Sequence, residues 1–392
     1  MIVHVPRRFA PDHWGGTETW LAALARWDIA QRIVTTTALC DQPSGDCAGI
    51  PVTRHPYFYP VWPLDRDLAA RWDRCGGNLL SSGVAEDIRL QPNLRLVHLH
   101  TGNRLGSQAL LAARRRGVPV VITLHGGHYA IPVAERQSLA GGSRRRGWEW
   151  GRVISLLLGT RRLLERVDAV VCVSPEEAEA VCHHLPRQRV RLIPGGVDLD
   201  DWNHGDALRG RTTFGLGPGP VIACIGRLDG QKDQATLVRA WLHLPQPRPW
   251  LVLAGAETEP GYGAQLTALA QGAERLVLAG QRDRQALADL LAAAAVAVLP
   301  SRHEPFGLAI LEAWAAGRAV IAADTGGPRS LLGDGVAGAL FPVGDDRALA
   351  ALLDDVRIPA WAEAAKAKAA AHAWEHRLAE LRSLYEELGA WA

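Results

Sequence analysis

Short apolar runs alternate with helical patterns along the whole chain of 392 residues. The runs are continuous and rich in Val, Ile and Leu, which is typical of strands buried on both faces of a sheet. Helical segments between them predict parallel βαβ units. The expected strands are 2–5, 33–37, 94–100, 118–125, 169–174 and 190–193 in the first half, and 221–226, 250–254, 275–279, 295–300, 319–322 and 338–342 in the second.

Turn-forming residues divide this pattern into two halves. The run Pro194-Gly195-Gly196 predicts a domain boundary. The chain length suits two domains of about 200 residues each. The predicted fold class is therefore α/β, with two Rossmann-like, doubly wound parallel sheets. We expect domains at 1–194 and 195–370, followed by an Ala-rich helical tail at 371–392.

Composition excludes several classes of function. The net charge of +2 gives no reason to expect a nucleic acid partner. No apolar stretch is long enough to span a membrane, and the first residues do not read as a signal peptide. The six cysteines form no close pair, and Cys172 and Cys224 sit in apolar runs as expected core residues. A reducing cytoplasm is the simplest setting.

The segment after the strand at 295–300 carries the strongest chemical signal. A helix is expected to begin near Pro305, because proline suits a first helical turn. The amides of Phe306, Gly307 and Leu308 would then face a ligand, and amides at a helix N-terminus bind phosphate.

Two carboxylates bracket this expected phosphate site. Glu312 lies in the second helical turn, where its side chain leans back and reaches ribose hydroxyls. Glu304 precedes the helix and would touch a sugar on the other side of the phosphates. The alternative is a purely structural capping box, because Ser301 and Glu304 have the spacing of that motif.

Arg227 and Lys232 follow the first strand of the second half. Ligands of doubly wound sheets bind beyond the carboxyl ends of the strands, so two positive charges are expected there. A diphosphate leaving group requires such charges as its bond to the sugar breaks. The alternative is a pair of solvated surface cations.

The first half offers weaker signals. Gly15-Gly16 before a helix suits close approach to a phosphate, although it is not the dinucleotide-binding fingerprint. His125 ends a strand and should point toward the ligand. His98 and His100 alternate along another strand and share one face, but no third metal ligand is evident. Polar lining or hydrogen-bonded core histidines are the favoured interpretation over a metal site.

Together these features resemble the retaining glycosyltransferases of glycosyltransferase family 4, which have the GT-B fold. The strongest match is a Glu-x7-Glu signature from Glu304 to Glu312 in HEPFGLAILEAWAAGRAVIAADTGG. The runs AVVCVSPEEAEAV and RLIPGGVDLDDW and the segment 226–232 match in order and spacing. The resemblance covers nearly the whole chain. It departs at Gly195, usually asparagine in the family, and at Ser330, often glutamate.

The resemblance implies a role for each matching residue in the second domain. Arg227 and Lys232 would hold the diphosphate, Glu304 would contact hydroxyls of the donor sugar, and Glu312 would contact the ribose. In the first, acceptor-binding domain, Gly16 would approach the phosphate.

His125 would orient the donor sugar, and it joins the expected catalytic set with Arg227, Lys232 and Glu304. The tail at 371–392 would cross back onto the first domain.

The implied reaction is transfer of a hexosyl unit from a UDP- or GDP-sugar to an acceptor hydroxyl with retention, in cell-surface polysaccharide or glycolipid synthesis. The resemblance implies no cofactor, no obligatory metal and no metal ligands in the site. The acceptor would be a glycan or lipid-linked glycan. Two alternatives remain open: an epimerase or sugar phosphorylase on the same fold, and a non-catalytic nucleotide-sugar-binding partner.

Clustered arginines and tryptophans predict a weak peripheral contact with the cytoplasmic face of a membrane. Arg144, Arg145 and Arg146 precede Trp148. Arginines attract anionic lipid, and tryptophan settles at the headgroup level. The alternative for the following segment, 150–167, is an ordinary helix packed on the sheet, and we favour it. The membrane hypothesis then rests on the preceding loop at 132–147.

Overall fold

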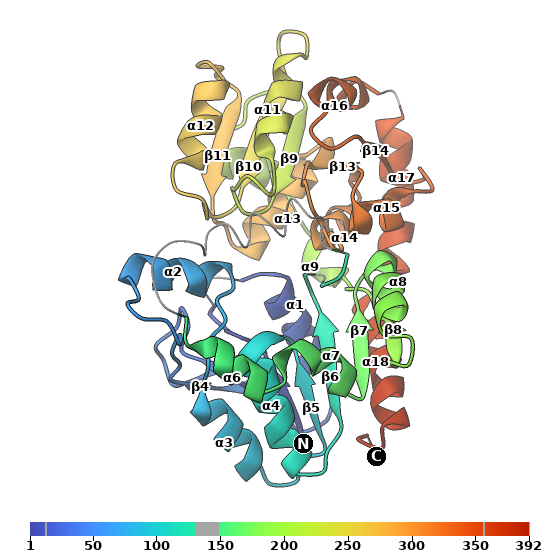
Figure 1. The fold of residues 1–392 in the computed structure, drawn as a ribbon. Helices are drawn as coiled ribbons and strands as arrows, with labels where there is room; N and C mark the ends of the chain where they lie inside the picture. Colours follow the sequence, from blue (N-terminus) through green and yellow to red (C-terminus); the bar gives the residue numbers. More distant parts are fainter. Residues whose placement is uncertain (12–13, 127, 131–148, 356, 392) are drawn as a thin grey trace. The chain divides into compact units, whose positions relative to one another are not determined.

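The structure is a computed structural model that describes residues 1–11, 14–126, 128–130, 149–355 and 357–391. Contacts between residues divide the chain into two compact units. The first contains Met1–Pro194 and Leu378–Ala392, and the second contains Gly195–Arg377. Each unit is an α/β domain built on one sheet (Figure 1).

The first unit contains an eight-stranded sheet in the order β3-β4-β2-β1-β5-β6-β7-β8. Its strands are β1 (Ile2–Val5), β2 (Gln31–Thr36), β3 (Ser44–Cys47), β4 (Ile50–His55), β5 (Leu96–Leu99), β6 (Val120–Leu124), β7 (Ala169–Cys172) and β8 (Val190–Leu192). All pair in parallel except β3 with β4. The predicted parallel sheet is confirmed, but the sequence pattern missed β3 and β4.

The helices of the first unit cover both faces of this sheet. They are α1 (Gly16–Ala23), α2 (Arg66–Cys75), α3 (Ser82–Leu90), α4 (Asn103–Arg115), α6 (Gly151–Leu157), α7 (Leu163–Arg166), α8 (Pro175–His184) and, from Leu378 onward, α18 (Trp374–Glu387). Val97 faces the core that α3 and α4 cover. His98 points to the opposite face, where Trp20 of α1 and Tyr385 of α18 contact its ring.

The second unit contains a fully parallel six-stranded sheet in the order β11-β10-β9-β12-β13-β14. Its strands are β9 (Val221–Ile225), β10 (Trp250–Ala254), β11 (Leu276–Gly280), β12 (Val296–Leu299), β13 (Ala319–Ala323) and β14 (Gly338–Phe341). All six lie where the apolar runs predict them. The buried Cys172 and Cys224 confirm the expected core positions.

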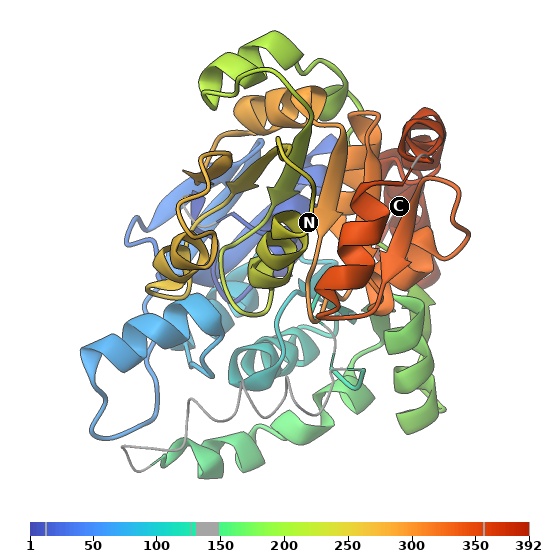
Figure 2. The same ribbon diagram turned by 90° about the horizontal axis from the view of Figure 1, so that it is seen from above.

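The helices of the second unit also lie on both faces of the sheet. They are α9 (Asp200–Asn203), α10 (Ala207–Thr213), α11 (Gln234–Leu242), α12 (Tyr262–Leu269), α13 (Arg284–Ala293), α14 (Leu308–Ala315), α15 (Gly326–Leu332), α16 (Asp346–Leu353) and α17 (Ile358–Ala370). Figure 2 shows α10 and α13 on one side of the sheet and α11 and α12 on the other. Leu237, Tyr262 and Leu349 place α11, α12 and α16 over one shared core.

Strand order explains where a ligand site should form in each unit. In the second unit β9 lies beside β12, although two strands separate them in sequence. The chain turns to opposite sides of the sheet after these neighbours, and ligands of doubly wound folds bind at such a switch point. The loops after β9 and β12 are those that carry the predicted charged residues. In the first unit the corresponding neighbours are β1 and β5.

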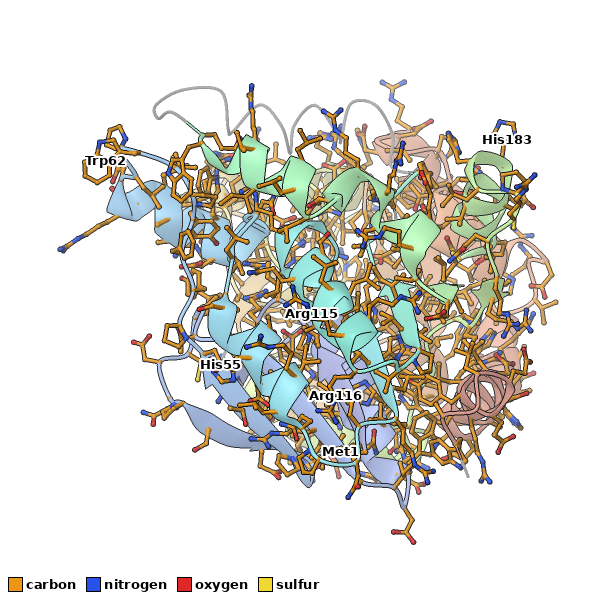
Figure 3. All side chains as sticks on the ribbon, turned by 60° about the horizontal axis from the view of Figure 1, so that its bottom comes forward. Met1, His55, Trp62, Arg115, Arg116 and His183 are labelled. Atoms are coloured by element: carbon orange, nitrogen blue, oxygen red, sulfur yellow. The ribbon has the colours of Figure 1, made fainter. Side chains whose placement is uncertain are left out.

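The first unit also exposes apolar side chains on α6. Leu156 and Leu157 are 81% and 79% exposed, and Val153 is 64% exposed. We call these three residues the α6 surface. The ring of Trp62 also projects outward, from the loop before α2 (Figure 3).

The expected packed helix over 150–167 is confirmed only for α7, whose Leu163 and Leu164 are buried in the core, and is wrong for α6. A 3-10 turn, Thr160–Arg162, separates α6 from α7, and most of the apolar side chains of α6 face outward. In the described part of the chain, no helix is long and apolar enough to cross a membrane.

Candidate active site

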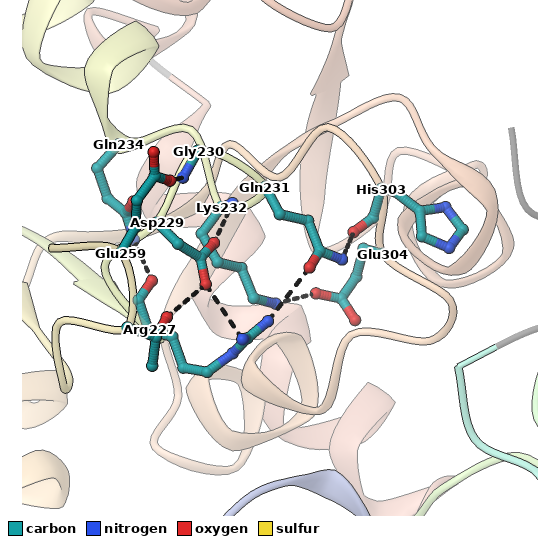
Figure 4. Close-up of polar contacts among 10 residues, drawn as sticks. Arg227, Asp229, Gly230, Gln231, Lys232, Gln234, Glu259, His303 and Glu304 are labelled. Carbon is teal, nitrogen blue, oxygen red and sulfur yellow. Dashed lines mark hydrogen bonds and ion pairs between the residues drawn. The ribbon is translucent and has the colours of Figure 1, made fainter. Parts of the chain in front are cut away.

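The loop after β9 is organised by a buried carboxylate. Asp229 accepts hydrogen bonds from the Lys232 amide at 3.0 Å and from Thr258 Oγ1 at 2.8 Å. Its Oδ2 also lies 3.2 Å from Arg227 Nη1. These contacts hold both predicted cations on one loop (Figure 4). Asp229 was not among the predicted site residues, although its place between Arg227 and Lys232 offered a signal.

The loop after β12 meets this loop through an ion pair. Lys232 Nζ lies 2.5 Å from Glu304 Oε2, and both side chains are mostly buried. Gln231 donates to the carbonyl of His303 at 3.2 Å, and the Arg302 amide donates to the carbonyl of Gln231 at 2.8 Å. The switch point thus brings together Arg227, Lys232 and Glu304, although Arg227 and Glu304 lie 77 residues apart in the sequence.

The helix after this loop begins later than predicted. Its first residue is Leu308, and Gly307 is the N-cap with φ at 97°. Because that left-handed conformation cannot continue a right-handed helix, Pro305 stays in the loop rather than in the first turn. The predicted start near Pro305 is therefore three residues too early, because α14 begins at Leu308.

The capping-box alternative is also not realised. Within the described ranges Ser301 Oγ is buried without a hydrogen-bond partner, and Glu304 lies before the helix. No side chain caps α14, so its first amides retain capacity for an anion. Phe306 is buried beside Gly307, and its backbone packs against Gly327.

Glu312 lies in the second turn of α14, as predicted. Burial raises the pKa of its carboxyl to about 7. Arg284 and Lys232 favour its charged form and Asp201 opposes it. Near neutral pH the carboxyl therefore exists in both protonation states, and the protonated form both donates and accepts hydrogen bonds.

The predicted residues of the first unit lie at the start of α1 and directly after β6. Gly16 is the exposed first residue of α1, and no side chain caps that helix at Gly15. His125 directly follows β6, is partly exposed, and has Nε2 2.9 Å from His100 Nδ1. Desolvation lowers the pKa of His125 to about 4, so the ring is neutral at physiological pH.

His4 supplies the third histidine that the sequence lacked for a metal site. Ring nitrogens of His4, His98 and His100 lie within 4.8 Å of one another. Every one of those nitrogens already has a hydrogen-bond partner, including Tyr385 and Thr123 for His98. A metal would have to displace these bonds, so the geometry favours hydrogen-bonded core histidines.

Two sequence-family models match the chain. The model described as Glycosyltransferase Family 4 matches residues 14–201. The model described as Glycosyl transferases group 1 matches residues 219–356, which contain Arg227, Lys232, Glu304 and Glu312.

Curated relatives and solved structures agree with these matches. The D-inositol 3-phosphate glycosyltransferase of Xylanimonas cellulosilytica is 34% identical over 308 residues, 74% of this chain and 71% of the relative. That of Mycolicibacterium paratuberculosis is 32% identical over 379 residues, 92% and 82% of the two chains. Sucrose-phosphate synthase from Thermosynechococcus elongatus superposes with a TM-score of 0.73 at 22% identity, covering 99% of both chains.

Anabaena HepE in complex with UDP and glucose superposes with a TM-score of 0.71 at 22% identity, covering 97% of this chain and 99% of that one. Both solved structures have the two parallel-sheet α/β domains of the GT-B fold. Family models, relatives and fold agree, and the chain belongs to glycosyltransferase family 4 and has the GT-B fold.

Proposed function

We propose that this glycosyltransferase moves a hexosyl unit from a nucleoside diphosphate sugar to an acceptor hydroxyl with retention, without an obligatory metal or cofactor. One observation carries the proposal: the Lys232–Glu304 pair at the switch point of the second sheet, with Arg227 held beside it by Asp229. The donor class is a UDP- or GDP-sugar. UDP is tested first, because HepE was solved with UDP-glucose.

The diphosphate is proposed to bind Lys232, Arg227 and the amides of Phe306, Gly307 and Leu308. Without a ligand, Lys232 is neutralised by Glu304 at 2.5 Å. A diphosphate carries more negative charge than one carboxylate and therefore competes for the lysine. Glu304 is then free to accept hydrogen bonds from hydroxyls of the sugar.

The ribose and the sugar are assigned to residues on either side of the phosphates. Glu312 is proposed to contact the ribose, and its raised pKa suits a carboxyl that exchanges hydrogen bonds with hydroxyls. In the first unit, Gly16 is proposed to approach the phosphate and His125 to orient the sugar. These roles derive from the family resemblance of the matching positions.

Retention is proposed to proceed by attack of the acceptor on the same face as the departing diphosphate. The acceptor oxygen forms a bond to the anomeric carbon while the bond to the diphosphate oxygen breaks. That phosphate oxygen takes the acceptor proton. Lys232 and Arg227 stabilise the charge that builds on the diphosphate, so the step requires no protein nucleophile.

The acceptor is proposed to be a hydroxyl of a glycan or glycolipid precursor in cell-surface synthesis. The curated relatives are named D-inositol 3-phosphate glycosyltransferases, which makes D-inositol 3-phosphate the first acceptor to test. A weak peripheral contact with the cytoplasmic face of a membrane is also proposed, carried by the α6 surface.

The test is incubation with radiolabelled UDP- and GDP-sugars, with and without D-inositol 3-phosphate. Transferred label and an α product from an α donor support the proposal. Epimerised sugar or sugar phosphate would instead indicate an epimerase or phosphorylase, and donor binding without turnover would indicate a non-catalytic partner. Activity lost in chelator and restored by magnesium or manganese contradicts the metal-independent part.

A further inference from the structure

A line of hydrogen bonds crosses the sheet of the first unit and ends at His125. Gln31 Oε1 lies 3.1 Å from His4 Nε2, His4 Nδ1 lies 3.3 Å from His100 Nε2, and His100 Nδ1 lies 2.9 Å from His125 Nε2. Gln31, His4 and His100 are buried. Adjacent parallel strands create this line, because His4 on β1 and His98 on β5 are register partners and His100 lies two residues further on the same face. We call Gln31, His4 and His100 the histidine relay.

The relay has a defined direction, set at the end farthest from His125. Gln31 Nε2 lies 2.8 Å from the carbonyl oxygen of Leu24, which can only accept a hydrogen bond. The amide nitrogen of Gln31 therefore faces Leu24 and its oxygen faces His4. Since an amide oxygen also only accepts, His4 must carry its proton on Nε2.

Neutral imidazole has one N–H, so each ring passes this constraint to the next. His4 Nδ1 must accept from His100 Nε2, and His100 Nδ1 must accept from His125 Nε2. Burial lowers the pKa of His4 to about 4 and that of His100 well below its usual value, which keeps both rings neutral. His125 is left with a lone pair on Nδ1, for which the described chain provides no partner.

We propose that Gln31, His4 and His100 are positioning residues that fix His125 in the tautomer protonated on Nε2, so that Nδ1 accepts a hydrogen bond from a hydroxyl of the donor sugar. This inference rests on the proposed function, which places the sugar at His125. The inference adds a requirement on the substrate that the site assignment alone does not contain. The sugar must present a hydroxyl that donates a hydrogen bond to His125. A nucleotide sugar with fluorine or O-methyl in place of that hydroxyl leaves the His125 Nδ1 lone pair without a hydrogen bond. Its sugar is therefore transferred more slowly.

A neighbouring histidine supplies a matched control. His98 stacks on His100 with ring centroids 4.3 Å apart, but its nitrogens bond to Tyr385 at 2.5 Å and Thr123 at 2.7 Å. Tyr385→Phe therefore removes one hydrogen bond from the same buried cluster without touching the relay. It separates loss of tautomer control from a general loss of packing or stability.

The experiment measures histidine 15N chemical shifts and transfer kinetics for the full chain. Wild type is expected to show an unprotonated Nδ1 and a protonated Nε2 for His125, with its signals assigned by their loss in His125→Gln. Gln31→Met removes the acceptor that sets the direction, so both tautomers of His125 should appear. Its kcat should fall about twofold, because with two comparable tautomers about half of the molecules present the wrong nitrogen to the sugar, with a smaller change in KM.

A second variant tests the direction itself. Gln31→Lys offers only donors to His4, so every ring should reverse and His125 Nδ1 should carry the proton. Tyr385→Phe should keep the wild-type tautomer and kcat, even where its melting temperature falls. A protonated Nδ1 in wild type, an unchanged tautomer in Gln31→Met, or an equal loss of kcat in Tyr385→Phe would overturn the inference. The spectra need no substrate, so absence of transfer by wild type would instead contradict the proposed function.

Discussion

Lys232 and Glu304 partly neutralise each other before any ligand binds. Their charged atoms are 2.5 Å apart and their side chains are 19% and 13% exposed, so water screens the pair only partly. Loss of either residue leaves the other charge without its partner. We expect Lys232→Ala and Glu304→Ala each to lower kcat/KM by about 10²–10³-fold, the usual cost of removing one group that stabilises transition-state charge.

A lysine elsewhere in the second unit serves as the matched control for that prediction. The chain contains only three lysines, and Lys368 pairs with Asp334 away from the loops after β9 and β12. Lys368→Ala should keep kcat/KM within about twofold, because single surface ion pairs contribute little. The test measures kcat/KM for sugar transfer by all three variants, after circular dichroism has shown that each one is folded. Near-normal turnover in Lys232→Ala or Glu304→Ala refutes the site assignment.

Glu312 should make stability fall as pH rises. Its pKa is raised from 4.5 to about 7, so between these pH values the folded state holds a proton that the unfolded state releases. The free energy of unfolding should therefore decrease over this window by up to about 3 kcal/mol. Glu312→Gln cannot release the proton and should lose less stability across the same range.

Urea unfolding of both proteins at pH 5 and pH 8 measures this difference. The buried histidines, whose lowered pKa values act in the opposite direction, are common to both proteins and cancel in the comparison. An identical decrease in the two proteins would show that Glu312 does not titrate as described.

At the scale of elements, the first turn of α15 fixes the loop that carries Glu304. The Gly327 amide donates to the carbonyl of Glu304 at 3.0 Å, and a Cβ on Gly327 would lie 2.3 Å from the carbonyl oxygen of Phe306. The atoms that this Cβ would overlap belong to the backbone, so the overlap can be relieved only by displacing the loop or the start of α15. Gly327→Ala should cost about 1–3 kcal/mol of stability and lower kcat/KM by more than about tenfold, because Glu304 moves with the loop.

Ser330→Ala is the control on the same helix. Ser330 Oγ donates to the carbonyl of Gly327 at 2.8 Å within the first turn of α15, so its loss does not displace the neighbouring loop. Thermal unfolding and transfer kinetics of the two variants are compared. Full activity in Gly327→Ala would mean that the loop tolerates displacement and that its position does not limit catalysis.

The strands show which elements a sequence pattern can reveal. Continuous apolar runs predicted the buried parallel strands, because a strand covered on both faces has no polar side. β4 was missed since its residues are buried and exposed in alternation, and β3 because its side chains are mostly exposed at the sheet edge. The start of α14 was misplaced because it depends on the left-handed conformation of Gly307, which proline at position 305 does not reveal.

The sequence predicted the charged residues of the candidate site but not the contacts between them. Arg227, Lys232 and Glu304 were predictable because each is a charged residue in a loop after a buried strand. Their pairing was not, since it depends on β9 and β12 being neighbours in the sheet. His4 gave no signal alone in an apolar strand, and its partnership with His100 follows only from the register of β1 and β5.

At the scale of the whole molecule, the α6 surface is where we place the proposed membrane contact. Val153, Leu156 and Leu157 are mostly exposed, and Arg161 and Arg162 follow them as exposed cations. Exposed leucines and valine insert into the headgroup region, and each nearby arginine adds about 1 kcal/mol of attraction to anionic lipid. Arg144, Arg145, Arg146 and Trp148, on which the sequence prediction rested, lie outside the described residues.

We expect wild type to co-sediment with anionic phosphatidylglycerol vesicles at low salt and to be released at high salt, because the electrostatic part is screened. Leu156→Ser combined with Leu157→Ser should abolish most of this binding, and Arg161→Ser combined with Arg162→Ser should weaken it and flatten its salt dependence. Leu90→Ser is the matched control, since Leu90 is 72% exposed on α3 of the same unit but lies outside the α6 surface. Binding that is equal in wild type and the Leu156/Leu157 variant, or lost equally in Leu90→Ser, would exclude the α6 surface as the membrane contact.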